Sequence, residues 1–143
     1  MHLCSIDMTS PSLTGNERAL LADKARETLS HAYAPYSNFR VGAAVLTEAG
    51  NIFTGVNVEN ASYGLTICAE RAAIFNAVAG EGPDMRVKAL AVVCEQPGPC
   101  HPCGACRQVL AEFGADAIVI FQGRDGLEEA SISQLLPRAF NLR

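Results

Sequence analysis

The spacing of hydrophobic residues changes several times along the chain, and each change marks a predicted element. After a capping-box sequence at 14–17, an apolar residue recurs at every fourth position, which predicts a first helix over 15–31. Two short apolar runs, 41–47 and 52–58, then flank the turn residues Ala49-Gly50-Asn51. This arrangement predicts a β-hairpin.

The second half of the chain alternates helix and strand patterns. A run that begins at Cys68 is apolar on nearly every side to about Ala79, which is typical of a buried helix. The pattern then predicts, in order, a strand over 88–94, a helix over about 104–114, a strand over 117–121, at most one further short strand, and a short helical turn over 133–136.

Such alternation predicts an α/β domain in which helices cover a sheet. The two later strands are joined through a helix and should be parallel, whereas the hairpin makes the sheet mixed. The length of 143 residues suits a single domain over 1–143, and we expect a flexible N-terminal segment over 1–13.

Charge and hydropathy exclude some classes of partner. The net charge of −4 argues against a polynucleotide, which usually needs a basic face. No apolar run approaches the roughly 20 residues of a membrane span. The first residues also lack the basic and apolar segments of a signal peptide. We therefore expect a cytoplasmic protein that binds neither nucleic acid nor membrane.

The cysteines introduce chemistry, because six in a cytoplasmic chain of this size indicate metal ligands or redox centres rather than disulfides. Cys103 and Cys106 are three apart at a predicted helix start, so both sulfurs share one face. Cys68 opens another predicted helix, and two helices that follow strands can begin at one edge of the sheet. Three thiolates can then converge on a zinc ion. No chemical role is evident for the remaining cysteines, which are Cys4, Cys94 and Cys100.

Glu70 gives the thiol cluster a catalytic interpretation. Cys68 has no second thiol nearby, and this asymmetry indicates three protein ligands with an open fourth position, as in catalytic zinc sites. Glu70, not needed as a ligand, is then free to move protons. A zinc ion with three thiolates has a net charge of about −1, which the two helix N-termini and a cation compensate. Arg71 and Arg107 are the candidates, and we favour Arg71 because it shares a turn with Cys68.

Other interpretations of the thiols remain open at this point. Cys103-Gly104-Ala105-Cys106 also fits a thioredoxin-type redox pair, although that leaves Cys68 and Glu70 unexplained. A structural zinc site explains the thiols but not Glu70. Cys100 and His101 have ligand-type side chains, but we assign them to the loop before the helix.

Several motifs together resemble a known family. Cys68-Ala69-Glu70 and the segment 102–109 (Pro-Cys-Gly-Ala-Cys-Arg-Gln-Val) resemble the zinc-dependent nucleoside and nucleotide deaminases, in their three-cysteine branch. The stretches 36–42 and 57–64, with the ending 135–140, resemble small cytidine deaminases specifically. The resemblance covers about residues 15–140.

This resemblance implies a three-layer α/β/α fold with a mixed, mostly five-stranded sheet, in a homotetramer with active sites at subunit interfaces. It implies one Zn²⁺ per subunit. The implied reaction, part of pyrimidine salvage, converts cytidine and 2′-deoxycytidine to uridine and 2′-deoxyuridine with release of ammonia. A zinc-bound hydroxide attacks C4 of cytosine, while Glu70 carries protons to ring N3 and to the departing amine.

The resemblance also implies substrate contacts. Asn57 and Glu59 lie two apart in a predicted extended segment, so their side chains face the same way. An amide and a carboxylate suit sugar hydroxyls, and the family uses these positions on the ribose. Phe39 resembles the aromatic residue that stacks on the pyrimidine. Further substrate-binding positions follow by resemblance alone: Asn60, Ala61, Tyr63, Ala69 and Phe140. Of these, Ala61, Tyr63 and Phe140 resemble residues that reach a neighbouring subunit's substrate.

Three rival functions compete with a free-nucleoside deaminase. A deaminase of another substrate, such as an aminonucleoside antibiotic, is disfavoured by the stretch 57–64. A non-enzymatic zinc module predicts that Glu70→Gln changes no activity. A base editor of polynucleotides is disfavoured by the acidic charge.

Overall fold

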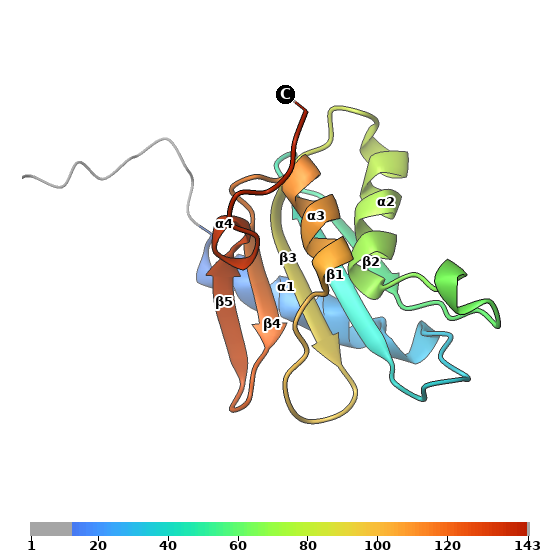
Figure 1. Ribbon diagram of the computed structural model, residues 1–143. Coiled ribbons are helices and arrows are strands. Elements are labelled where there is room, and N and C mark those ends of the chain that lie inside the picture. The colour runs from blue at the N-terminus through green and yellow to red at the C-terminus, as the bar shows by residue number, and fades with distance from the viewer. Residues whose placement is uncertain (1–12, 143) are drawn as a thin grey trace, which may run out of the picture.

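Five strands form one mixed sheet at the centre of the computed structural model, which describes residues 13–142 (Figure 1). The strand order is β2-β1-β3-β4-β5. β1 is antiparallel to both β2 and β3, β3 is parallel to β4, and β4 is antiparallel to β5. The strands are β1 (Val41–Thr47), β2 (Ile52–Val56), β3 (Val87–Cys94), β4 (Ile118–Gln122) and β5 (Leu127–Ser131).

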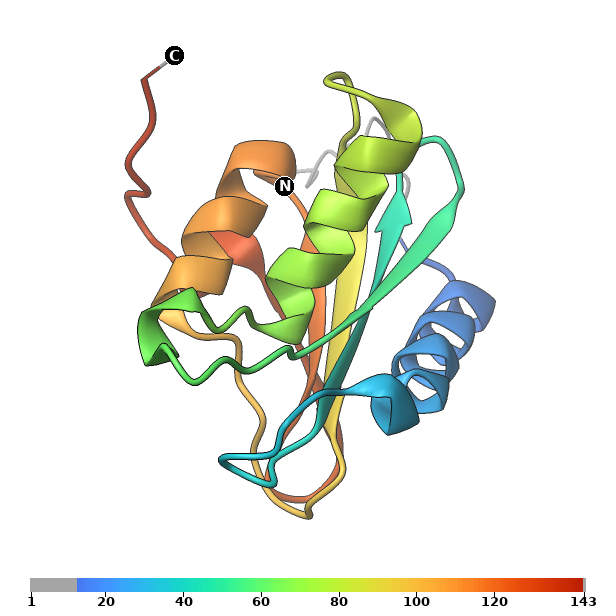
Figure 2. The ribbon, with the colours of Figure 1, turned by 90° about the vertical axis from the view of Figure 1, so that its right-hand side faces the viewer.

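Helices cover both faces of this sheet. α1 (Gly15–Glu27) packs on one face, and α2 (Ala69–Glu81) and α3 (Gly104–Phe113) pack side by side on the other (Figure 2). The short helix α4 (Ile132–Leu135) follows β5 and contacts α3. The predicted three-layer α/β/α fold with a mixed five-stranded sheet is therefore confirmed. None of the helices within 13–142 is long and apolar enough to cross a membrane.

The first helix is shorter than predicted. Its start is confirmed, because the Thr14 side chain accepts a hydrogen bond from the Glu17 N–H and the Glu17 carboxylate accepts one from the Thr14 N–H. The helix ends at Glu27, and a separate 3₁₀ turn over Leu29–His31 completes the predicted range. Of the predicted flexible segment, 1–12 lie outside the described residues, and Leu13 is buried against α1 and the sheet.

The second helix is buried on one face only, whereas the sequence predicted burial nearly all round. Ala73, Ile74 and Ala77 are fully buried, but Phe75 is 48% exposed on the outer face of α2. The prediction was wrong here because composition alone does not show how many neighbours a helix has, and α2 has the sheet on one side only. Its outer face is uncovered in this chain, and the exposed residues there include Phe75, Asn76 and Ala79.

The position of α2 depends on Gly55 in β2. A Cβ atom at Gly55 would lie 2.3 Å from the Ala73 nitrogen and 2.6 Å from the Ala69 oxygen, so any side chain would push the helix away. Glycine therefore allows the helix backbone to approach the sheet closely. This close contact fixes where α2 begins, and with it the position of Cys68 and Glu70.

Strand direction brings the two helix starts together. β2 and β3 are both antiparallel to β1, so they run in the same direction and end at the same edge of the sheet. α2 follows β2 and α3 follows β3, so both helices begin at that edge (Figure 2). The sequence predicted this convergence, and the loops 57–68 and 95–103 complete it.

Candidate metal centre and active site

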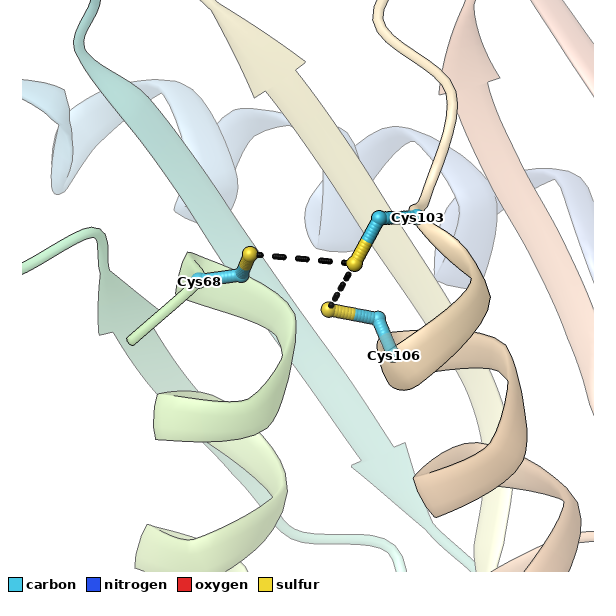
Figure 3. Close-up of side chains that lie close together, drawn as sticks. All are labelled: Cys68, Cys103 and Cys106. Atoms are coloured by element: carbon cyan, nitrogen blue, oxygen red, sulfur yellow. Dashed lines mark hydrogen bonds between the residues drawn. The ribbon is translucent and has the colours of Figure 1, made fainter. Parts of the chain in front are cut away.

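Three cysteine sulfurs meet where α2 and α3 begin. Cys68 and Cys103 are the N-cap residues of these helices, and Cys106 lies one turn into α3 (Figure 3). The Sγ atoms of Cys68 and Cys103 are 3.9 Å apart, those of Cys103 and Cys106 are 3.4 Å apart, and all three lie within 4.8 Å of one another. The structure therefore brings the three predicted ligands together.

These separations fit a zinc ion. Four ligands in a tetrahedron with zinc–sulfur bonds of about 2.3 Å place their sulfurs about 3.8 Å apart, close to the distances found. The donors are three soft sulfurs, which zinc accepts readily. Cys100 and His101 do not belong to this ligand group. The three protein donors leave a fourth tetrahedral position for water or substrate.

Positive groups surround the sulfurs. An Arg71 Nη2–H donates to the Cys68 Sγ at 3.3 Å, and the N-terminal ends of α2 and α3 add their partial positive charge. Hydrogen bonding from Cys106 and from Arg71 lowers the pKa of the Cys68 thiol to about 5. The contact with Cys68 in turn raises the pKa of Arg71. Arg107, the other candidate cation, contacts carbonyl groups instead.

Glu70 is buried next to this cluster. Its side chain is in the first turn of α2 and only 5% exposed. Burial, reinforced by the nearby negative charge of Cys68, raises the pKa of Glu70 to about 7. A carboxyl group with a pKa near neutrality can both accept and donate a proton in the same reaction cycle.

A cavity of about 270 Å³ opens over the thiol cluster and Glu70. Four of the predicted substrate-binding residues line it: Phe39, Asn57, Glu59 and Ala69. Ser37 and Val41, from the turn before β1 and the start of β1, also line it, as do Thr66, Ile67, Cys100 and His101 from the loops before the two helix starts. The volume is suited to a small planar ligand, and Cys68 and Cys103 of the thiol cluster line the cavity.

Asn57 and Glu59 line the cavity, and they also hold one of its walls in place. The Asn57 Oδ1 accepts from the Val41 N–H at 2.9 Å, and its Nδ2 donates to the Phe39 oxygen at 2.7 Å. One Glu59 carboxylate oxygen accepts the Tyr36 and Ser37 N–H groups, and the other accepts the Ser37 hydroxyl. These bonds lower the pKa of Glu59, the hydroxyl most of all.

Four of the predicted substrate-binding residues lie outside this cavity. Tyr63 is 77% exposed and packs edge-on against Tyr36, and Phe140 is 71% exposed on the C-terminal tail. Asn60 and Ala61 belong to the exposed loop before the 3₁₀ turn Tyr63–Leu65, where the Asn60 Oδ1 accepts the Ser62 N–H at 2.9 Å. Within this chain they do not reach the thiol cluster.

Sequence reasoning assigned no role to two residues of the cavity wall. Cys100 is buried, and the His101 ring packs edge-on against Phe121 with ring centroids 4.9 Å apart. Their only sequence signal is their place, three residues before Cys103 for Cys100 and two residues before it for His101. Burial raises the pKa of the Cys100 thiol to about 12, so this thiol is a poor nucleophile.

Comparisons with known proteins agree with this geometry. The family model of the cytidine and deoxycytidylate deaminase zinc-binding region matches residues 16–122, a span that holds the three cysteines and Glu70. The chain belongs to this family. Membership decides the open question about the thiols in favour of zinc over a redox pair.

Individual members of the family are similar over most of their length. The cytidine deaminase of Sporosarcina psychrophila is 49% identical over 120 residues, which are 82% of this chain and 85% of the relative. That of Halalkalibacterium halodurans is 48% identical over 126 residues, 87% of this chain and 94% of the relative. The crystal structure of cytidine deaminase from Burkholderia pseudomallei superposes with a TM-score of 0.78 at 47% identity, over 85% of this chain and 98% of that chain.

Proposed function

We propose that this deaminase-family protein converts cytidine and 2′-deoxycytidine to uridine and 2′-deoxyuridine with release of ammonia. One observation carries the proposal: a buried carboxyl group with a pKa near 7 faces the same cavity as a three-cysteine zinc site. The similar proteins named above, all cytidine deaminases, support it. Free nucleosides as substrate and product suggest a role in pyrimidine salvage in the cytoplasm.

Glu70 moves the protons of this reaction. When bound by Cys68, Cys103 and Cys106, zinc activates a water molecule as the nucleophile. Glu70 accepts one proton from this water and delivers it to ring N3. It then takes the proton of the hydroxyl group now on C4 and passes it to the departing amine, so that the C4–N bond breaks and the C4 carbonyl forms. Its raised pKa suits both steps, because the carboxylate is basic enough to take the proton and acidic enough to return it.

The cavity walls orient the nucleoside. Phe39 packs on the pyrimidine, Ala69 lies beside it, and Asn57 and Glu59 face the sugar. Both polar side chains already bind the backbone of 36–41, so their positions are set before the substrate arrives. Such preorganisation avoids the entropic cost of ordering the site during binding.

Zinc-loaded protein is expected to remove the absorbance band of cytidine and of 2′-deoxycytidine and to produce equimolar ammonia. A substrate panel that includes aminonucleoside antibiotics and single-stranded polynucleotides distinguishes this activity from the two rival deaminase functions. If cytidine and 2′-deoxycytidine both stay unchanged, the assignment fails. Turnover only of another panel member would assign the same chemistry to that substrate.

We also propose a homotetramer in which subunits complete one another's active sites. Ala61, Tyr63 and Phe140 are exposed and outside their own cavity, so a contact with substrate needs a neighbouring copy. The exposed Phe75 ring on the uncovered side of α2 supports such packing. We expect a native mass about four times that of the 15.1 kDa chain by analytical ultracentrifugation. A fully active monomer would contradict this proposal.

Arg71 offers a test of charge compensation. Arg71→Ala removes the cation bonded to Cys68, so we expect zinc retention or turnover to fall about 10- to 100-fold, as for other outer-shell partners of metal ligands. Competition with a chelating dye measures retention, and steady-state kinetics measure turnover. Arg124→Ala, in the exposed turn before β5, is the control. Normal zinc content and normal kinetics in Arg71→Ala would remove Arg71 from the site.

A further inference from the structure

The loop between β3 and α3, residues 95–103, forms one wall of the active-site cavity at the lower end of the sheet (Figure 1). Cys100, His101 and Cys103 of this loop line the cavity. The loop has no helix or strand of its own and contains three prolines. Proline has no N–H to donate, so Pro99 cannot close a β-turn on the Gln96 carbonyl. Something outside the loop must hold it.

Gln122, the last residue of β4, makes that contact. Its Nε2 donates to the Gln96 oxygen and to the Gly98 oxygen, both at 2.8 Å. Its Oε1 accepts from the Cys94 N–H at 3.3 Å, and its backbone oxygen accepts from the Cys100 N–H at 2.7 Å. One residue thus binds the loop at Gln96, Gly98 and Cys100.

The amide group of glutamine matches these partners atom for atom. A primary amide has two N–H donors and one carbonyl acceptor, and here each donor has its own carbonyl and the acceptor has an N–H. Gly98 has a backbone φ of +107°, a value that residues with a side chain rarely adopt. The chain can therefore turn sharply between the carbonyl groups of Gln96 and Gly98, which Gln122 binds. A carboxylate of the same shape has no donor and would face both carbonyl oxygens.

The contacts continue from Gln122 to the metal ligand. Phe121, the preceding residue of β4, supports the His101 ring. Neighbouring side chains of a strand point to opposite faces, so Phe121 and Gln122 hold the loop from two sides as it crosses the end of the sheet. At the far end, the Arg107 Nε–H donates to the Pro102 oxygen at 2.7 Å, directly before Cys103. The wall is therefore held along its whole length.

We propose that Gln122 is a positioning residue of the active site: it holds the 95–103 loop so that Cys100 and His101 form the substrate wall and Cys103 reaches the metal. Gln122 itself does not line the cavity. It acts through the loop, and the amide donors are the essential part of its side chain. The kinetic consequence rests on the proposed deamination, whereas the ordering of the loop does not.

Two near-isosteric variants test this role. Gln122→Glu keeps the acceptor for the Cys94 N–H but loses both donors, and Gln122→Met loses all three side-chain bonds without adding charge. We expect both to lower kcat/KM for cytidine about 10- to 100-fold, the range typical of outer-shell partners. We expect KM to rise because Cys100 and His101 line the cavity, and zinc retention to fall because Cys103 ends the loop, while Glu70 and Cys68 on α2 are untouched. Hydrogen–deuterium exchange of peptides over 95–103 should speed up at least about tenfold.

Gln134→Glu provides the matched control, because it makes the same change on α4, where the new carboxylate can still accept the Ser131 N–H. Gln122 variants with KM, kcat and loop exchange all within about twofold of the control would overturn the proposal. So would a lower melting temperature with unchanged KM and loop exchange, since that result indicates stability alone.

If neither Gln122 variant folds, amide exchange in the wild-type protein tests the role of Gln122 instead. The Cys94 amide, bonded to the Gln122 side-chain Oε1, should then be protected from exchange, and exchange at the rate of an unstructured peptide would overturn the proposal. If zinc-loaded wild type does not deaminate cytidine, the proposed function fails by itself. Loop exchange in the variants then tests the role of Gln122 independently.

Discussion

Replacing Glu70 by glutamine is expected to lower kcat for cytidine by about 10²- to 10⁴-fold while the protein keeps its fold and its zinc. Glutamine has nearly the same volume, so the buried position at the start of α2 stays filled. An amide, however, can neither accept the water proton nor return it to the ring or the amine. Steady-state kinetics and zinc analysis of the purified variant measure the two parts of this expectation.

Glu59, the other carboxylate of the cavity, cannot replace Glu70. Hydrogen bonds from Ser37 and from the Tyr36 N–H lower the pKa of Glu59, whereas burial raises the pKa of Glu70 to about 7. Two carboxylates with opposite pKa shifts have different roles, and only the one with the raised pKa can act as an acid near neutrality. Glu112→Gln, on the exposed side of α3, is the matched control. A Glu70→Gln protein with wild-type turnover would favour the non-enzymatic zinc module.

Cys106→Ser is expected to remove zinc almost completely, from about one ion per chain to about none, and activity with it. Cys106 is 1% exposed, so no other group can move in to complete the site. A serine hydroxyl is not ionised at neutral pH and is a hard oxygen donor, unlike the thiolate that zinc prefers. Zinc analysis after gel filtration gives the occupancy directly. The variant should also melt at a lower temperature than zinc-loaded wild type, because the stabilisation from bound metal is lost.

Cys94→Ser separates metal loss from the general effect of changing a buried cysteine. Cys94 is also buried, but its sulfur donates to the Gln96 oxygen at 3.1 Å, and a hydroxyl can make the same bond. We expect this control to keep full zinc and activity. Equal zinc content in Cys106→Ser and Cys94→Ser would show that Cys106 is not a ligand.

Local sequence patterns predicted the elements well where neighbouring residues decide the structure. The strand Val41–Thr47 has the predicted bounds, and the capping box at Thr14 starts α1 as expected. Predictions were less accurate where an element ends. α1 stops at Glu27 instead of continuing to residue 31, and β2 stops at Val56 instead of residue 58. Element ends depend on contacts with other parts of the chain, which periodicity does not contain.

The metal ligands themselves could be predicted from the sequence. Two cysteines three apart at the start of α3 must present their sulfurs on one face of that helix. Cys68 precedes α2, and the strands before α2 and α3 run in the same direction. Spacing and strand order suffice for this inference. The rest of the cavity could not be predicted from the residues alone, because its walls come from loops that have no periodic pattern.

Cys68-Ala69-Glu70 and Cys103-Gly104-Ala105-Cys106 thus predicted, by residue type and spacing, three candidate zinc ligands and a spare carboxyl group, and family membership decided for zinc over a redox pair. Only the tertiary structure decided what these groups do. It buries Glu70 so that its pKa rises to about 7, and places Arg71 rather than Arg107 on a ligand sulfur. Desolvation and ion pairing depend on distances between segments far apart in the chain, and folding sets those distances.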